Sequence, residues 1–429
     1  MNEIQQKFLF LQGPHGPYFA ELGQALVSSG YSVCKIGFNR GDRFFWPQDL
    51  PYTAYTGDEA HWPVALEQHI RDEKITDIVL YGDARPLHRI AVQAAHQLGI
   101  KIHCFEEGYL RPFWATYERS GSNGNSALMD LTIEQMRGLI DKDAPALEEA
   151  PSQWGPLWHH IWYGALFHLN LLLPSKTYAN YRPHRENSIG EEFIHGVWAL
   201  ATMPLRSISR RIATRRLLKR SAPYYLGLLQ LGHDSSIVSH SAFDTNKQFV
   251  DLCIKEFSRG SAAPLRLVFK THPLDDGRDK LGRHIRNSAK NQGIADRVDF
   301  ITGGKLGTLL DHATGAITIN STAAQQALWR GLPVRAIGNS VFKKAELVSQ
   351  QPLAEFFSKP TPPDLAAYQD YRWFLLQTSQ VPGGYYTAKG RTALVERVVD
   401  MMLADEGPYS RLNMIKKAHE TGKPDHLQS

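Results

Sequence analysis

Residues 77–108 read DIVLYGDARPLHRIAVQAAHQLGIKIHCFEEG, and this stretch decides the fold class. Two short apolar runs, Asp77–Tyr81 and Lys101–Phe105, flank a segment with a helical pattern, Pro86–Leu98. Short apolar runs joined by a helix are typical of a βαβ unit, in which the two strands are parallel. The sequence therefore predicts a parallel sheet covered by helices.

The same alternation extends through the rest of the chain. The run Phe8–Leu11 precedes a helical pattern over Tyr18–Val27, and the run Ser32–Phe38 follows it. A second block of this kind starts near Pro223. Its predicted strands are Tyr224–Leu229, Leu265–Lys270, Val298–Thr302, Ala316–Ile319 and Val334–Ile337, and its predicted helices are Asn246–Phe257, Lys280–Asn291, Leu306–His312 and Ala323–Arg330. The pattern thus predicts two Rossmann-like α/β domains.

These patterns divide the chain into four predicted parts. Residues 1–150 form an N-terminal Rossmann-like domain, and residues 223–385 form a C-terminal one. Residues 151–222 form a connecting segment rich in aromatic and basic side chains. Residues 386–429 contain a helix, Lys389–Leu403, followed by a tail that we expect to fray.

Composition narrows the class of protein. With 429 residues, of which 42% are hydrophobic and 21% charged, the chain is that of a folded globular protein long enough for two domains. The formal net charge of +5 is modest for this size, so we expect no nucleic-acid partner.

The cysteines indicate a reducing compartment, because all of them fall in predicted core elements. They are Cys34, Cys104 and Cys253. Neither a secretory signal pattern nor an apolar window of about 18 residues is present, so we expect a cytoplasmic protein without a spanning helix.

Polar motifs stand at the ends of four predicted strands. They are Glu106-Glu107-Gly108, Gln230–Asp234, Lys270–Pro273 and Asn320–Thr322. In an open α/β sheet, ligands bind outside the carboxyl ends of the strands. Carboxylates, a His-Pro pair and a hydroxyl pair collected at that edge favour sugar transfer from a nucleotide donor.

The two carboxylate motifs provide the candidate catalytic residues. An acceptor hydroxyl needs a base, and Glu106 or Glu107 can supply one. Because side chains alternate along a strand, only one of the pair should point into the site; the other interpretation is a solvated acidic turn. Asp234 is the second candidate carboxylate, although an ordinary helix N-cap explains it equally well.

The other two motifs suit a phosphate group. His272 can reach a phosphate, Pro273 fits a first helical turn, and Lys270 adds a charge. Amide and hydroxyl groups precede a predicted helix at Asn320, Ser321 and Thr322. The competing interpretations are a buried structural histidine and an ordinary helix cap.

Motifs for common cofactors are missing. The loop Gln12–Pro17 lacks both G-x-G-x-x-G and the Lys-Ser/Thr ending of a phosphate-binding P-loop, so ATP and NAD are poorly supported. The histidines are scattered, and none falls into H-E-x-x-H. We therefore expect no cofactor and no metal.

Several of these motifs resemble one known family. Phe105–Pro112, Asn123–Ser126 and Lys270–Asp275 are similar to the capsular polysaccharide biosynthesis family of β-Kdo transferases, in its form with a single catalytic module. The resemblance runs from about Phe8 to about Tyr386. The acid-acid-Gly, His-Pro and Ser-Thr motifs also resemble bacterial sialyltransferases, which use CMP-linked donors.

This resemblance implies a GT-B-type fold, with two Rossmann-like domains facing across a cleft. It implies a retaining double displacement in which Asp234 is the nucleophile and Glu107 the acid/base, with Glu106 as the other candidate. CMP would then bind at the His-Pro and Ser-Thr motifs. The acceptor side would contain His15, Gly13, Arg111 and Asn123.

The implied activity is transfer of Kdo from CMP-β-Kdo to (lyso)phosphatidylglycerol, which starts the poly-Kdo linker of a Gram-negative capsule. The implied location is the cytoplasmic face of the inner membrane, where other capsule biosynthesis or export proteins are possible partners. The alternatives are another CMP-sugar transferase of the sialyltransferase kind and a non-catalytic capsule export or assembly factor.

The middle segment leaves two interpretations open. An aromatic run over Trp154–Pro174 precedes a basic run over Leu205–Arg220. The first interpretation is a core helix followed by a solvated linker helix. The second is a lipid-facing patch, because aromatic residues favour the bilayer interface and basic segments bind anionic lipid.

Overall fold

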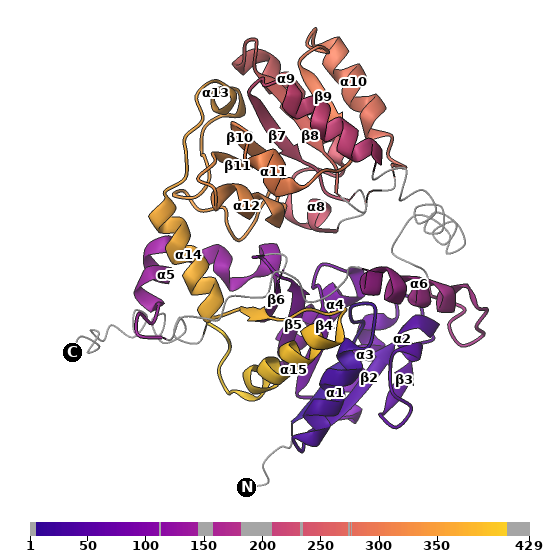
Figure 1. Ribbon diagram of the computed structural model, residues 1–429. Coiled ribbons are helices and arrows are strands. Elements are labelled where there is room, and N and C mark those ends of the chain that lie inside the picture. Colours follow the sequence, from indigo (N-terminus) through magenta and orange to yellow (C-terminus); the bar gives the residue numbers. More distant parts are fainter. Residues whose placement is uncertain are drawn as a thin grey trace. The chain divides into compact units, whose positions relative to one another are not determined.

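The computed structural model describes residues 6–110, 113–144, 158–181, 208–231, 235–272, 275 and 277–409 (Figure 1). The chain divides into two compact units. Unit 1 comprises Met1–Phe193 and Arg372–Ser429, and unit 2 comprises Ile194–Tyr371. The chain thus enters unit 2 once and returns to unit 1 within a helix, α14 (Leu365–Gln377).

Unit 1 is built on a seven-stranded sheet with the order β12-β6-β5-β4-β1-β2-β3. Its strands are β1 (Lys7–Phe10), β2 (Ser32–Gly37), β3 (Tyr52–Ala54), β4 (Asp77–Tyr81), β5 (Lys101–Glu107), β6 (Trp114–Arg119) and β12 (Gln380–Pro382). Strands β1 to β5 pair in parallel, whereas β6 and β12 pair antiparallel at one edge.

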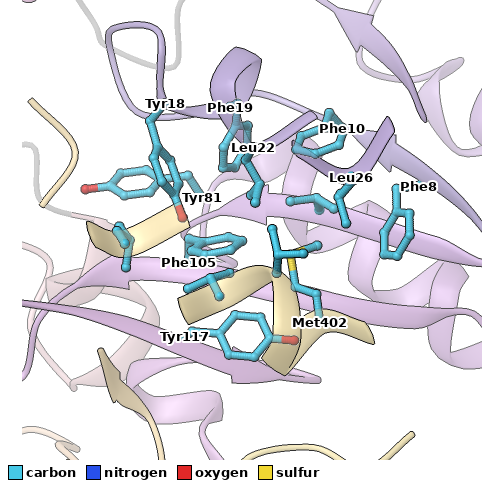
Figure 2. Close-up of a cluster of buried hydrophobic side chains, with 14 of the residues drawn as sticks. Phe8, Phe10, Tyr18, Phe19, Leu22, Leu26, Tyr81, Phe105, Tyr117 and Met402 are labelled. Atoms are coloured by element: carbon cyan, nitrogen blue, oxygen red, sulfur yellow. The ribbon is translucent and has the colours of Figure 1, made fainter. Parts of the chain in front are cut away.

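Alternating side chains of β1 divide the core of unit 1 between the two faces of this sheet. Phe8 and Phe10 join the cluster under α1 (Tyr18–Ser28) and α15 (Ala388–Leu403), where Figure 2 shows Leu22, Leu26 and Met402. Leu9 and Leu11 join the cluster under α3 (Trp62–Asp72) and α4 (Pro86–Leu98). Both faces are therefore apolar, as a parallel sheet covered by helices requires.

The C-terminal segment completes unit 1. Helix α15 packs against α1, and Arg391 Nε donates to both carboxylate oxygens of Glu21, each at 2.9 Å. The return to this unit begins at Arg372, before the predicted residue 386, because β12 must reach β6 to pair with it. The other helices in the described part of unit 1 are α2 (Arg40–Phe44), η1 (Asn123–Asn125), η2 (Ala127–Asp130), α5 (Ile133–Leu139) and α6 (Trp158–Leu172).

Unit 2 is built on a five-stranded, all-parallel sheet with the order β11-β10-β7-β8-β9. Its strands are β7 (Tyr224–Leu228), β8 (Arg266–Lys270), β9 (Val298–Ile301), β10 (Gly315–Thr318) and β11 (Val334–Ala336). Numbered along the chain, this order is the same as that of β1 to β5 in unit 1. The predicted α/β class with two Rossmann-like domains is confirmed; that the two face across a cleft stays a prediction.

Two adjacent tyrosines show how the helices of unit 2 cover both faces of its sheet. The Tyr225 hydroxyl donates to the Phe356 carbonyl of α13 (Leu353–Ser358), whereas the Tyr224 hydroxyl donates to the Leu309 carbonyl of α11 (Leu306–Leu310). Helices α9 (Asn246–Gly260) and α10 (Leu281–Asn291) share the core on the side of Tyr225. The other helices in the described part of unit 2 are α8 (Ser235–His240), η3 (Thr322–Ala324), α12 (Gln325–Leu328) and a helix over 208–219.

Candidate functional site

The pair Glu106 and Glu107 lies inside β5 rather than after it. The strand was predicted to end at Phe105, but pairing with the antiparallel β6 carries it two residues further, to the turn at Gly108. Glu107 Oε1 accepts hydrogen bonds from the Tyr81 hydroxyl (3.1 Å) and from the Tyr386 hydroxyl (3.3 Å). None of the described residues donates to Oε2 of Glu107, so one oxygen of this carboxylate is left for a ligand.

Glu106 is bound by different groups. Its Oε1 accepts from the Glu107 N–H (3.0 Å), and its Oε2 accepts from Asn123 Nδ2 (3.4 Å). A Cβ on Gly82 would lie 3.3 Å from Oε2, so the turn after β4 passes close to this carboxylate. Asn123, with a φ of +52°, is held by its N–H donating to the Tyr109 hydroxyl at 2.6 Å. The alternation of the pair thus separates Glu106 from Glu107, and Asn123 contacts Glu106.

Three residues around Glu107 were missed by the sequence reasoning. Tyr81 and Tyr386 bind the carboxylate, and the His160 ring from α6 stacks on Tyr386 with centroids 4.1 Å apart. Burial lowers the pKa of His160, and the charge of Glu107 opposes that shift. Burial also raises the pKa of Tyr81 well above its ordinary value, and Glu107 adds to this, so the hydroxyl stays protonated as a donor.

The loop after β1 packs under the same helix, α6. The His15 ring stacks on Phe167 with centroids 4.2 Å apart. Gly13 faces the Phe19 ring, where a Cβ would lie 2.7 Å from its Cδ2. His15 therefore meets the middle of α6, whose first turn carries His160, whereas Gly13 packs on Phe19 of α1. The remaining candidate of this side, Arg111, lies outside the described residues.

A buried polar cluster adjoins this loop and was not predicted. Arg85 donates to Gln12 Oε1 (2.9 Å), and Gln12 Nε2 donates to Asp42 Oδ1 (3.3 Å). Burial raises the pKa of Asp42, and the charge of Lys35 opposes the shift. A cavity of about 10 Å³, lined in part by Lys35 and Asp42, lies beside them and has room for a single water molecule.

In unit 2, Lys270 and His272 stand at the carboxyl end of β8. Lys270 Nζ donates to the Thr271 carbonyl at 3.2 Å. Burial lowers the pKa of Lys270 to about 8, and Arg210 contributes to the shift. The His272 carbonyl accepts from the Asp275 N–H (3.0 Å), while Pro273 lies outside the described residues.

Asn320, Ser321 and Thr322 follow β10 at the same edge. Ser321 Oγ accepts from the Ala323 N–H (3.3 Å) and so caps η3. The predicted single helix Ala323–Arg330 is wrong, because the chain forms a three-residue 3-10 turn and then the four-residue α12. So short an element brings little helix dipole to a phosphate, and the side chains would have to supply the hydrogen bonds.

The sheet order brings these candidates of unit 2 to one edge. Strands β8 and β10 pair with β7 on its two sides, so Lys270 and His272 flank the end of β7 opposite Asn320 and Ser321. The chain that continues β7 leads through Gln230 to Asp234, which lies outside the described residues.

The described residues contain no group of three or more histidine, cysteine, aspartate or glutamate side chains that could hold a metal ion. Over the same part of the chain, no helix is both long and apolar enough to cross a membrane.

Comparison with known proteins gives a consistent family. The family model described as "Capsule polysaccharide biosynthesis protein" matches residues 76–386. The Escherichia coli "Capsule polysaccharide export protein KpsS" is 32% identical over 384 residues, which cover 89% of this chain and 97% of that protein. The "Capsule polysaccharide modification protein LipB" of Neisseria meningitidis serogroup B is 29% identical over 395 residues, covering 90% of this chain and 93% of that protein.

Among solved structures, Thermosulfurimonas dismutans KpsC, beta Kdo 2,7 transferase, aligns with a TM-score of 0.45 and 11% identity. The alignment covers 92% of this chain and 100% of that chain. The structure of Anabaena Alr3699/HepE in complex with UDP and glucose aligns with a TM-score of 0.32 and 9% identity, covering 97% of this chain and 100% of that chain.

Proposed function

This chain belongs to the capsule polysaccharide biosynthesis family, and from that premise we propose that it is a glycosyltransferase acting in capsule assembly. The proposed donor is CMP-β-Kdo and the proposed acceptor is (lyso)phosphatidylglycerol. One observation carries the proposal furthest. Glu107 presents a carboxylate at the carboxyl end of β5, with hydroxyl donors on Oε1 and with Oε2 left unbonded by the described residues.

The proposed reaction is a double displacement with retention. A carboxylate oxygen of Asp234 attacks the anomeric carbon of Kdo, the bond to the phosphate oxygen breaks, and CMP leaves with the bonding electrons. The acceptor hydroxyl then attacks the same carbon while Glu107 takes its proton, and the ester bond to Asp234 breaks. Tyr81 and Tyr386 hold one oxygen of Glu107 by hydrogen bonds, and in the second step this carboxylate accepts the proton of the acceptor.

The proposed donor site uses the carboxyl edge of unit 2. The phosphate and sugar of CMP would be bound from both sides of β7. Lys270 and His272 lie on one side, and the hydroxyl and amide groups of Asn320, Ser321 and Thr322 lie on the other. No cofactor or metal takes part in this scheme.

Helix α6 supports the proposed lipid acceptor. Trp158 and Trp162 are 55% and 53% exposed, and Leu169 and Leu173 continue this exposed apolar face. The helix contains no Asp, Glu, Lys or Arg, and its other face carries His160 and Phe167 to the candidate site. We propose that the exposed face of α6 rests on the cytoplasmic leaflet of the inner membrane, so that a lipid acceptor reaches Glu107.

The test is direct synthesis. The protein is incubated with CMP-Kdo generated in situ and a fluorescent phosphatidylglycerol, and the product is analysed for mass and linkage. Formation of a Kdo-lipid by wild type, and its absence with Glu107→Gln, supports the proposal.

The name of the Escherichia coli relative favours a second candidate, a capsule export factor without catalysis. That alternative predicts no product with any nucleotide sugar, together with binding of finished capsular polysaccharide that Glu107→Gln leaves unchanged.

A further inference from the structure

Thr271 has a buried hydroxyl to which no described residue bonds. The residue is 1% exposed, and its Oγ1 has no hydrogen-bond partner in the part of the chain that the structure describes. Its backbone N–H donates to the Ile301 carbonyl at 3.1 Å, so the chain continues β8 through this residue. Leu267 and Phe269 of β8 belong to the core under α9, and alternation along the strand turns Thr271 to the same face. The hydroxyl therefore lies at the carboxyl end of β8, on the side of α9.

Asn246, the first residue of α9, has a second oxygen of this kind. Its Nδ2 donates to the Gln230 carbonyl at 2.9 Å, just beyond β7. This bond fixes the orientation of the amide, because the reverse orientation would bring Oδ1 against the carbonyl oxygen. The residue is 2% exposed, and Oδ1 has no partner among the described residues. Asn246 thus presents an acceptor at the carboxyl end of β7.

The two oxygens belong to neighbouring strand ends. Strand β7 pairs with β8, and beyond the last pair the Leu229 N–H donates to the Lys270 carbonyl at 2.9 Å. Thr271 follows Lys270 directly. Gln230, to which Asn246 is bonded, follows Leu229 directly. Asn246 and Thr271 are therefore held on adjacent chains at the edge that carries the candidate donor residues.

Other buried hydroxyls of this sheet bond within the protein. At the amino end of β7, Tyr224 and Tyr225 are 2% and 1% exposed, and both hydroxyls donate to carbonyls. The Thr318 hydroxyl of β10 donates to the Leu228 carbonyl at 3.2 Å. A buried polar atom without a partner lowers stability and calls for an explanation. Two such oxygens at an edge where α/β sheets bind ligands indicate groups that a ligand completes.

We infer that Asn246 and Thr271 recognise the base of the donor nucleotide, and that Asn246 Oδ1 accepts a hydrogen bond from an exocyclic amino group. Both oxygens belong to uncharged side chains, which suit an uncharged base, whereas Lys270 and His272 at the same edge suit the phosphate. Cytosine has a 4-amino group that donates to Oδ1, whereas uracil has a 4-oxo group that Oδ1 repels. That the ligand is a nucleotide rests on the proposed function; the choice of an amino over an oxo group does not depend on which sugar is transferred.

Nucleotide selectivity tests Asn246. Calorimetry measures the affinities of wild type and of Asn246→Ala for CMP and UMP. Wild type should bind CMP at least about tenfold more tightly than UMP, because UMP leaves Oδ1 unpaired. Asn246→Ala should lose most of this selectivity by weakening the binding of CMP alone. Loss of the bond to Gln230 distorts the site for both nucleotides alike, so the ratio of the two affinities reports recognition rather than folding.

Thr271→Val tests the second oxygen. The variant replaces a hydroxyl by a methyl group of similar size and breaks no hydrogen bond of that hydroxyl within the described residues. Without ligand it should melt no lower than wild type, whereas its affinity for CMP should fall by roughly two- to tenfold. Thr314→Val is the matched control, because it makes the same change just before β10, at the opposite edge of the sheet. The control should leave the affinity for CMP unchanged.

The outcomes separate this inference from the proposed function. If CMP binds wild type and both variants equally well, the base site is overturned while the CMP donor survives. An equal loss of CMP and UMP binding in Asn246→Ala would overturn the recognition of an amino group and assign Asn246 to the ribose or to the fold. A melting temperature well below that of wild type in Thr271→Val would make Thr271 structural and overturn its part in the site. If CMP binding shows the expected dependence but no Kdo is transferred from CMP-Kdo, the base site stands and the proposed transfer fails.

Discussion

At the scale of single residues, removing the hydroxyl of Tyr386 should lower the rate of turnover without changing the affinity for CMP. Tyr386→Phe keeps the ring that stacks on His160 but removes one donor to Glu107. We expect turnover to fall by about tenfold, because one hydrogen bond to a charged group is lost, while CMP affinity stays the same. Initial rates at saturating donor and calorimetry with CMP measure the two quantities.

Tyr18→Phe is the matched control, since the Tyr18 hydroxyl is buried in the same unit without a partner among the described residues. Equal rates in the two variants would contradict the role of Tyr386.

The order of the two displacements gives a second expectation. Glu107→Gln cannot take the proton of the acceptor, but it leaves the attack of Asp234 on the donor unaffected. We therefore expect a Kdo adduct to accumulate on Asp234 in Glu107→Gln and to be absent in Glu107→Gln combined with Asp234→Asn. Mass spectrometry of intact protein and of its peptides detects it. An adduct on another residue, or retained activity in Asp234→Asn, would remove Asp234 from the mechanism.

Glu118 should make stability depend on pH. This side chain on β6 is fully buried and accepts from the Tyr409 hydroxyl at 3.1 Å. Burial raises its pKa from 4.5 to about 8. Between these values the folded state holds a proton that the unfolded state has released, so Glu118 lowers stability increasingly as pH rises through this window.

Glu118→Gln, which mimics the protonated form, should be more stable than wild type at pH 8.5 and differ less from it at pH 5. Urea midpoints at the two pH values measure this, with Glu134→Gln on an exposed position as the control. A midpoint difference that does not vary with pH would show that Glu118 titrates as an ordinary glutamate.

At the scale of elements, α6 and the helix over 208–219 present two surfaces that suit a membrane in different ways. If the apolar face of α6 is the contact, Trp158→Ala with Trp162→Ala should weaken binding to anionic vesicles by at least about tenfold, since each buried tryptophan contributes a few kcal/mol. Vesicle co-sedimentation at low and high salt measures this.

The basic surface is tested by Arg211→Gln, Arg215→Gln and Arg216→Gln, whose effect on vesicle binding should vanish at high salt. Arg210 is left out because it faces Gly303. Wild-type binding by the tryptophan variant would make the face of α6 something other than a membrane contact.

The elements differ in how far sequence alone predicted them. β4 and α4 match their predicted bounds because their apolar spacing is regular and their neighbours are close in the chain. The antiparallel β6 and β12 were missed: β12 has three residues, one of them proline, and exists because β6 is there to pair with. Pairing with the missed β6 extended β5 through Glu106 and Glu107, so missing the next strand also misplaced the end of β5 at the site.

At the scale of the whole molecule, the same contrast holds for the candidate site. Glu107, Lys270 and Ser321 were predicted because each follows or ends a strand of its own βαβ unit. Tyr386 and His160 were not, because their contacts cross long stretches of chain; the bond from Tyr386 to Glu107 spans 279 positions. The local sequence pattern identifies which strand ends have polar side chains that could bind or react with a ligand. The residues that contact those side chains come from distant parts of the chain, and only tertiary packing places them there.

The division of unit 1 between the two ends of the chain has a consequence for biosynthesis. The ribosome synthesises all of unit 2 before it makes β12, which pairs with β6, and α15, which packs against α1. Until then, the aromatic cluster that Figure 2 shows lacks its final layer, and a nascent chain exposes it to chaperones and proteases. A chain stopped after Tyr371 should therefore retain protease-resistant unit 2 while losing unit 1, which limited proteolysis can detect. Translation that ends early would thus leave unit 1 incomplete, because α15, from near the end of the chain, completes the unit that the N-terminal strands begin.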